Sequence, residues 1–146
     1  MKRGEEMVVR NWMRRNPITV EPEIGVKTAF LILKKYKIRQ LPVIKDGILI
    51  GIVTDRDIRK PEIPDIFLSR NQPYKLEDGV RVGDIMTMEV ITVNEDTPVV
   101  EAACLLIKHK INGLPVISRD GKLSGIITTS DILGAFVRLY GHPYSV

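Results

Sequence analysis

The segment GIVTDRD at residues 51–57 occurs a second time, as GIITTSD, at residues 125–131. In each copy a β-branched, apolar run ends in a Thr that is followed three residues later by an Asp. This order predicts a buried strand that leads directly into a helix, because an N-cap Thr with an acidic residue at N3 forms a capping box. The repetition indicates two copies of one structural unit.

The similarity extends outward from these two segments. Residues 13–44 align with residues 86–117 at a shift of 73, and residues 46–58 align with residues 120–132 at a shift of 74. The shared blocks are ITV, LPVI and Asp-Gly, with apolar residues at helical spacing between the first two. Each copy therefore predicts strand, helix, strand, strand, helix, and Asp-Gly predicts a hairpin because it supplies the positive φ of a tight turn.

These boundaries predict an α+β chain with three parts. Residues 1–60 form the first repeat with an N-terminal segment, and residues 80–146 form the second repeat. Residues 61–79 contain Pro61, Pro64 and Pro73 and are interpreted as a linker.

Composition excludes several classes of protein. Of the 146 residues, 44% are hydrophobic and 27% are charged, which is typical of a globular chain with a core. No apolar stretch approaches the roughly 20 residues of a membrane span, and the N-terminus lacks the apolar core of a secretory signal, so we expect a cytoplasmic protein. The single Cys104, within AACLLI, is expected to be buried, and with two histidines it offers no disulfide or zinc framework.

The charge is uneven along the chain. The net charge is +4, yet residues 1–39 hold ten Lys or Arg against four Asp or Glu. A basic N-terminal half is compatible with nucleic-acid binding, although solvated helix faces often carry the same pattern.

The T-x-x-D segments carry the clearest chemistry. A strand that turns into a helix leaves backbone N–H groups facing outward, where a phosphate fits beside Thr or Ser hydroxyls. A carboxylate nearby accepts hydrogen bonds from the two hydroxyls of a ribose. The same pattern is also typical of a capping box, which stabilises the start of a helix without any ligand. Both interpretations stay open at this point.

The order ITV, helix, LPV, Asp-Gly hairpin and T-x-x-D, present twice, resembles a tandem pair of CBS domains. The resemblance covers residues 7–60 and 80–140. It implies two repeats related by a pseudo-twofold axis, with their sheets facing each other and two clefts that bind adenosine nucleotides.

The resemblance also implies composite binding sites. One cleft takes residues from the first T-x-x-D segment and apolar or polar residues from the second repeat, namely Thr54, Arg56 and Asp57 with Ile91, Ile111, Asn112 and Pro115. The other takes Thr128, Ser130 and Asp131 with Ile18, Ile38, Arg39 and Pro42. The Asp residues are expected to hold the ribose, the Thr residues and their neighbours to hold phosphate, and the apolar residues to flank adenine.

The ligand expected from Arg39 and Arg56 is AMP or ATP, with ADP, S-adenosylmethionine and NAD-type molecules as alternatives. The cleft that contains Asp131 ranks first, because it joins the T-x-S-D pattern to Arg39. No catalytic cofactor and no metal are expected.

The predicted function is a stand-alone regulatory module without catalytic activity, which binds an adenosine nucleotide and transmits its occupancy to a partner protein. Neither a phosphate-binding glycine loop nor a metal-ligand spacing occurs. We also expect a homodimer through the final helix, DILGAFVRLY, and the helix after the third strand of the first repeat. The alternatives are a nucleic-acid-binding accessory protein and a small-molecule enzyme with a site in the same cleft.

Overall fold

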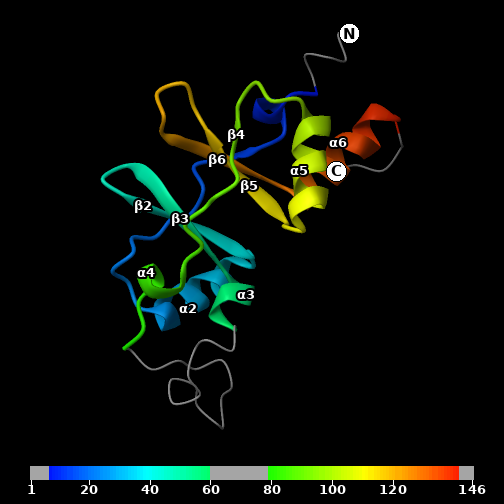
Figure 1. Cartoon of the computed structure of the whole chain (residues 1–146). Coiled ribbons are helices and arrows are strands. Elements are labelled where there is room, and N and C mark those ends of the chain that lie inside the picture. Colours follow the sequence, from blue (N-terminus) through cyan, green and yellow to red (C-terminus); the bar gives the residue numbers. More distant parts are fainter. Residues whose placement is uncertain (1–6, 60–78, 142–146) are drawn as a thin grey trace. The chain divides into compact units, whose positions relative to one another are not determined.

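The computed structural model describes residues 7–59 and 79–141, and they have a mixed α+β fold with two sheets, as predicted (Figure 1). Most of the predicted linker, residues 61–78, lies outside the described residues. The described residues divide into two compact units. We call residues 18–59 and 79–90 the first-repeat unit, and residues 7–17 and 91–141 the second-repeat unit.

The division into units does not follow the boundaries expected from the repeat. The segment that precedes each repeat in the sequence packs with the other repeat. Thus residues 7–17 belong with the second repeat and residues 79–90 with the first, whereas the sequence was divided at 1–60 and 80–146. We call this arrangement the strand exchange and residues 7–17 and 79–90 the exchanged segments. Strand pairing explains it, because each exchanged segment adds to the edge of the other repeat's sheet.

The first-repeat unit is a two-stranded hairpin covered by helices (Figure 1). Its elements are α2 (Val26–Tyr36), β2 (Gln40–Lys45), β3 (Ile48–Thr54), α3 (Asp55–Ile58) and α4 (Val82–Ile85). The predicted hairpin is confirmed, with Asp46 and Gly47 at φ values of 52° and 80° in the turn. Leu41, Val43 and Val53 are fully buried and pack with α2 to form the core.

The second-repeat unit is built on a four-stranded sheet with the order β1-β6-β5-β4. Its elements are η1 (Val9–Asn11), β1 (Arg14–Arg15), β4 (Val93–Asn94), α5 (Val99–His109), β5 (Gly113–Ile117), β6 (Leu123–Thr128) and α6 (Thr129–Leu139). β4 pairs with β5 in parallel, and the other pairs are antiparallel. Helices α5 and α6 pack side by side (Figure 1). Leu114, Val116 and Ile127 are fully buried at the centre of this core.

Two glycines allow the preceding segments to approach the sheets closely. A Cβ atom on Gly125 would lie 2.6 Å from the backbone oxygen of Arg14 and 2.9 Å from the sulfur of Met13. A Cβ atom on Gly51 would lie 2.6 Å from the sulfur of Met86. All three distances are shorter than van der Waals contact, so the missing side chains make room for the preceding segment beside each sheet.

Two expectations from the sequence need correction. The ITV strands are shorter than predicted: in the first repeat only Val20 makes a bridge, to Val43, and in the second repeat the pairing begins at Val93. Cys104 is exposed, and the prediction of burial was wrong. α5 buries Val99, Ala102 and Leu106, and a residue two positions after Ala102 points away from that face.

Candidate functional site

Both T-x-x-D segments form the predicted capping box. In the first-repeat unit, the backbone N–H of Thr54 donates to Oδ2 of Asp57 over 3.0 Å, and the N–H of Asp57 donates to Oγ1 of Thr54 over 3.1 Å. In the second-repeat unit, the N–H of Thr128 donates to Oδ2 of Asp131 over 2.8 Å, and the hydroxyl of Thr128 donates to the same oxygen over 2.9 Å. Each helix start is therefore stabilised, and this role accounts for one oxygen of each carboxylate.

The other carboxylate oxygen faces the exchanged segment. Oδ1 of Asp57 accepts a hydrogen bond from the Thr87 hydroxyl at 3.4 Å. Oδ1 of Asp131 lies 3.5 Å from Nε of Arg14. Arg14 and Thr87 occupy aligned positions, so the two repeats present a cation and a neutral hydroxyl to equivalent carboxylates.

Arg14 and Thr87 were not among the residues proposed from the sequence. The repeat alignment contained a signal, because both follow a methionine at the start of the aligned block. It gave no reason to join either residue to a T-x-x-D segment 117 or 30 positions away. That link depends on the strand exchange.

In the first-repeat unit, the predicted residues gather at one end of the hairpin. Gln40 pairs with Thr54 across the strands, and the backbone N–H of Asp55 donates to the carbonyl of Arg39 over 3.4 Å. The Arg39 and Arg56 side chains are exposed, whereas Asp57 is 5% exposed. The apolar members pack against or lie within the core, namely Ile18, Ile38 and Pro42.

The second-repeat unit repeats this arrangement. The backbone N–H of Thr129 donates to the carbonyl of Asn112 over 2.9 Å, so Asn112 adjoins the start of α6. Asn112 and Ser130 are exposed. Pro115 is fully buried in β5, and the partly buried side chains of Ile91 and Ile111 pack against the core. Within each unit the structure brings a T-x-x-D segment next to that repeat's own LPV strand. The grouping across repeats stays a prediction.

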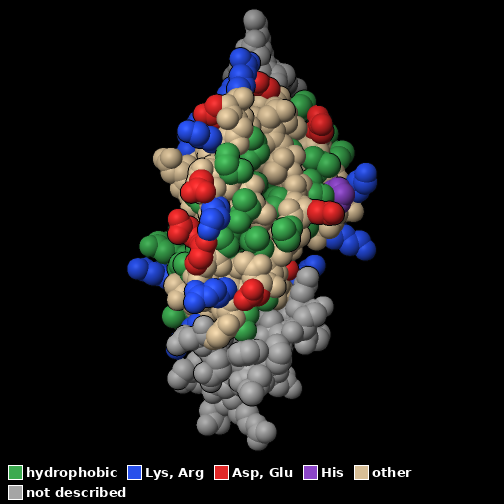
Figure 2. All heavy atoms as spheres, turned by 60° about the vertical axis from the view of Figure 1, so that its left-hand side comes forward, with side chains coloured by type: hydrophobic (Ala, Val, Ile, Leu, Met, Phe, Trp, Pro, Cys, Tyr) green, Lys and Arg blue, Asp and Glu red, His purple; other side chains and the backbone are tan. Residues whose placement is uncertain are grey.

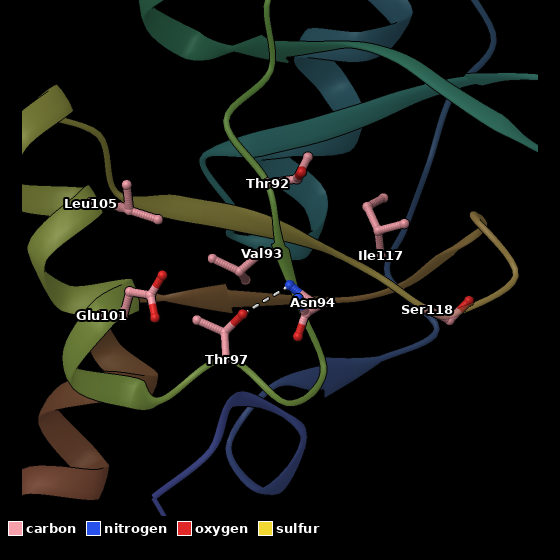
Figure 3. A pocket seen from close by; sticks show the side chains of 8 residues that line it. All are labelled: Thr92, Val93, Asn94, Thr97, Glu101, Leu105, Ile117 and Ser118. Atoms are coloured by element: carbon pink, nitrogen blue, oxygen red, sulfur yellow. Dashed lines mark hydrogen bonds between the residues drawn. The ribbon is translucent and has the colours of Figure 1, made fainter.

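A pocket of about 290 Å³ lies in the second-repeat unit between β4, the start of α5 and the end of β5 (Figure 3). Its lining is Thr92, Val93, Asn94, Thr97, Glu101, Leu105, Ile117 and Ser118. None of these residues was proposed as a ligand contact. Glu101 is the charged member, and the Thr97 hydroxyl is engaged by the backbone N–H of Asn94 at 3.1 Å. An acidic lining without a cation does not suit a phosphate.

Hydrogen bonds and ion pairs on the surface lower the pKa of several carboxyl groups. Hydrogen bonding from Arg10 lowers the pKa of Asp96, and hydrogen bonding from the Ser118 hydroxyl lowers the pKa of Asp120. In the first-repeat unit, Lys45 lowers the pKa of Glu23 in the same way. Acidic and basic side chains lie close together on the face shown in Figure 2. Among the basic residues of positions 1–39, Arg10 is paired in this way with Asp96.

In residues 7–59 and 79–141, no group of three or more His, Cys, Asp and Glu side chains is arranged to hold a metal ion. None of the helices in the same part of the chain combines the length and the apolar character needed to cross a membrane.

Comparison with protein families assigns the two repeats. The model of the CBS domain matches residues 9–61 and again residues 82–138. The chain belongs to the CBS-domain family. The resemblance drawn from ITV, LPV, Asp-Gly and T-x-x-D is therefore confirmed, and each repeat is a CBS domain.

Relatives of this CBS pair include both small proteins and parts of enzymes. A CBS domain-containing protein of Dictyostelium discoideum is 32% identical over 139 residues, which cover 92% of this chain and 94% of the relative. The inosine-5′-monophosphate dehydrogenase of Korarchaeum cryptofilum is 35% identical over 146 residues, which cover 99% of this chain but 26% of that enzyme. The chain thus corresponds to about a quarter of the dehydrogenase.

Solved CBS pairs have the same fold. The structure of CBSX2 of Arabidopsis thaliana in complex with AMP is 32% identical, with a TM-score of 0.74 and coverage of 91% of this chain and 98% of that one. The CBS domain pair of protein MJ0100, in complex with 5′-methylthioadenosine and S-adenosyl-L-methionine, is 33% identical, with a TM-score of 0.72 and coverage of 94% and 98%.

Proposed function

We propose that this CBS pair is a regulatory module that binds an adenosine nucleotide, with AMP or ATP as its ligand, and transmits occupancy to a partner protein. The observation that carries the proposal is the pair of T-x-x-D helix starts. Each has an Asp carboxylate close to an exposed polar side chain, Arg56 in α3 and Ser130 in α6. The similarity to CBS pairs solved with AMP and with 5′-methylthioadenosine and S-adenosylmethionine supports an adenosyl ligand.

The proposed chemistry follows from the groups at each helix start. Exposed Ser130 and exposed Arg56 stand in the first turns of α6 and α3, where helix N–H groups favour an anion. Asp131 keeps 11% of its side chain exposed, and a carboxylate accepts from both hydroxyls of a ribose. The residue sets expected from the sequence, with Arg39 as the further phosphate contact, remain the proposed sites.

Regulation by such a module requires a ligand that favours one conformation. A bound nucleotide changes the behaviour of a partner only if the two states of the CBS pair differ in affinity for it. We propose that the partner is a protein and that the chain itself is not catalytic. The cytoplasmic location expected from the sequence also stays a prediction.

Thermal unfolding tests ligand binding directly. AMP, ADP, ATP, S-adenosylmethionine, 5′-methylthioadenosine and NAD are each added to the full chain, with GMP as the control for the base. A ligand present at 100 times its Kd stabilises the folded state by about 2.7 kcal/mol, and we expect AMP or ATP to raise the Tm by several degrees. If none of the adenosyl ligands shifts the Tm more than GMP does, the proposal is contradicted.

We also propose a homodimer, with α6 in the interface. Leu133, Phe136 and Tyr140 are 59%, 58% and 73% exposed, whereas Ala135 is the buried residue of α6. Exposed apolar side chains that cluster on one helix are typical of an interaction surface. The other predicted interface helix begins as α3, and its continuation after residue 59 lies outside the described residues.

Light scattering at micromolar concentration tests the dimer. A single chain has a mass of 16.5 kDa, and we expect a particle of twice that mass. The variant Phe136→Glu should return the mass to that of one chain, because a charge on this face has to be desolvated in the interface. A wild-type particle with the mass of one chain would refute the dimer and leave the ligand proposal intact.

The nucleic-acid and enzyme alternatives gain no specific support. The basic residues Arg10, Arg15 and Arg81 are engaged with acidic or carbonyl groups of their own unit. Retention of DNA or RNA with a steep negative dependence on salt would favour the first alternative. Turnover of a bound nucleotide would favour the second.

A further inference from the structure

We propose that Arg14 sets the charge preference of the second-repeat unit, so that this unit favours phosphorylated adenosyl ligands over uncharged ones. The inference rests on the proposed function, because it assigns a specificity-determining residue to the proposed Asp131 site. It starts from a difference between the two units at aligned positions, where Arg14 faces Asp131 and Thr87 faces Asp57.

The backbone fixes Arg14 beside the site. β1 adds to β6 in antiparallel register, with Arg14 opposite Ile126 and Arg15 opposite Gly125. The close contact between Gly125 and the Arg14 carbonyl leaves no room for this strand to shift inward. Strand β6 ends at Thr128, the residue that caps α6. The sheet therefore fixes the Arg14 backbone near the start of α6, and the ion pair places its guanidinium at Asp131.

The first-repeat unit uses the same geometry with a neutral side chain. Thr87 lies opposite Ile52, with two backbone hydrogen bonds of 2.8 and 3.0 Å between them. Ile52 and Ile126 are aligned residues, as are Gly51 and Gly125. At this aligned position of the strand pairing, the second-repeat unit therefore has an arginine where the first-repeat unit has a threonine.

The charge of the carboxylate explains why this difference matters. An ionised Asp that accepts ribose hydroxyls also repels a phosphate attached to the same sugar, and the repulsion is stronger where solvent is partly excluded. Arg14 offsets the charge of Asp131 through Nε at 3.5 Å. A guanidinium has four further N–H donors on its two Nη atoms, in a geometry that suits phosphate oxygens.

The location of Arg14 keeps the expected effect moderate. Its side chain is 66% exposed, so solvent screens part of its charge. The groups around Asp131 that are exposed at the same helix start, Thr129 and Ser130, are uncharged. We therefore expect Arg14 to change the affinity for a phosphorylated ligand about ten-fold and the affinity for an uncharged ligand less than about two-fold.

The test compares AMP with 5′-methylthioadenosine, which replaces the phosphate by an uncharged methylthio group. Both Kd values are measured by calorimetry on the full chain carrying D57N, so that the signal comes mainly from the Asp131 site. Arg14→Gln should weaken AMP binding about ten-fold and leave 5′-methylthioadenosine binding nearly unchanged. Arg14→Lys, which keeps the charge, should retain most of the AMP affinity.

The reciprocal variant is Thr87→Arg, measured with D131N in place of D57N. Thr87 is exposed, so an arginine fits there, and the ratio of AMP affinity to 5′-methylthioadenosine affinity should rise. Unliganded Tm values of R14Q and R14K should match, which separates charge from folding.

Equal losses for the two ligands in R14Q, or no change in either, would overturn the role of Arg14 while the proposed function stands. Loss of AMP affinity in R14K as large as in R14Q would also overturn it. Absence of binding of both ligands to the wild-type chain would contradict the proposed function and this inference together.

Discussion

Replacing Asp131 by Asn is expected to raise the Kd of AMP by roughly a hundred-fold without unfolding the second-repeat unit. A charge-assisted hydrogen bond contributes about 1.5–3 kcal/mol, and the proposed ribose contact contains two of them. A loss of about 2.8 kcal/mol corresponds to a hundred-fold change. Isothermal titration calorimetry with wild type and D131N measures it, together with the loss of the AMP-dependent rise in Tm.

The amide is chosen because Asp131 also caps α6. In the wild-type chain the N–H of Thr128 donates to Oδ2 of Asp131 over 2.8 Å. The side-chain carbonyl oxygen of an Asn accepts the same bond, so most of the helix start is preserved. Asp131→Ala would remove the cap and the ligand contact together and would not separate them.

Asp120→Asn is the matched control, because it makes the same charge change at an exposed turn residue. It should leave the AMP affinity unchanged. If D131N binds AMP like wild type, the capping box is the whole role of Asp131 and the site lies elsewhere.

Replacing Leu114 by Ala is expected to lower the free energy of unfolding by about 2–5 kcal/mol. Leu114 is fully buried in β5 and packs at the centre of the second-repeat core. Truncation removes favourable burial and leaves a cavity that close-packed neighbours fill only in part. At roughly 2–4 °C per kcal/mol, the Tm should fall by about 10 °C in a thermal melt.

Leu31→Ala provides the control, because it removes the same atoms from an exposed position on α2, outside the proposed interface. Its effect on the free energy of unfolding should stay within about 0.5 kcal/mol. If L114A and L31A lowered the Tm equally, Leu114 would not lie at the centre of a core. Leu41→Ala, at the aligned position of the first-repeat unit, should resemble L114A.

Short local sequence patterns predicted much of the fold. Asp-Gly at 46–47 specified a tight turn through its backbone preference, and both T-x-x-D segments, each four residues long, specified capping boxes. The order of elements and the membership of the CBS family followed from these short patterns. The apolar run AACLLI did not specify which side of α5 meets the core, and Cys104 lies on the exposed side.

The site was predictable only in part. Thr128, Ser130 and Asp131 were proposed from the sequence because their chemistry lies within four consecutive residues. Arg14 was missed because its contact with Asp131 spans 117 positions of sequence, and no local preference records such a distance.

For this protein the sequence by itself determined the two repeats, their hairpins and the caps of the helices that follow them, since each of these depends on neighbours within a few residues. Only the tertiary structure decided which preceding segment joins which sheet, and therefore which side chain faces each carboxylate. Backbone hydrogen bonds between β1 and β6, and between Thr87 and Ile52, make that choice. These bonds join groups that are far apart in the chain, and every sheet edge presents the same N–H and C=O groups, so local sequence preferences do not specify the pairing.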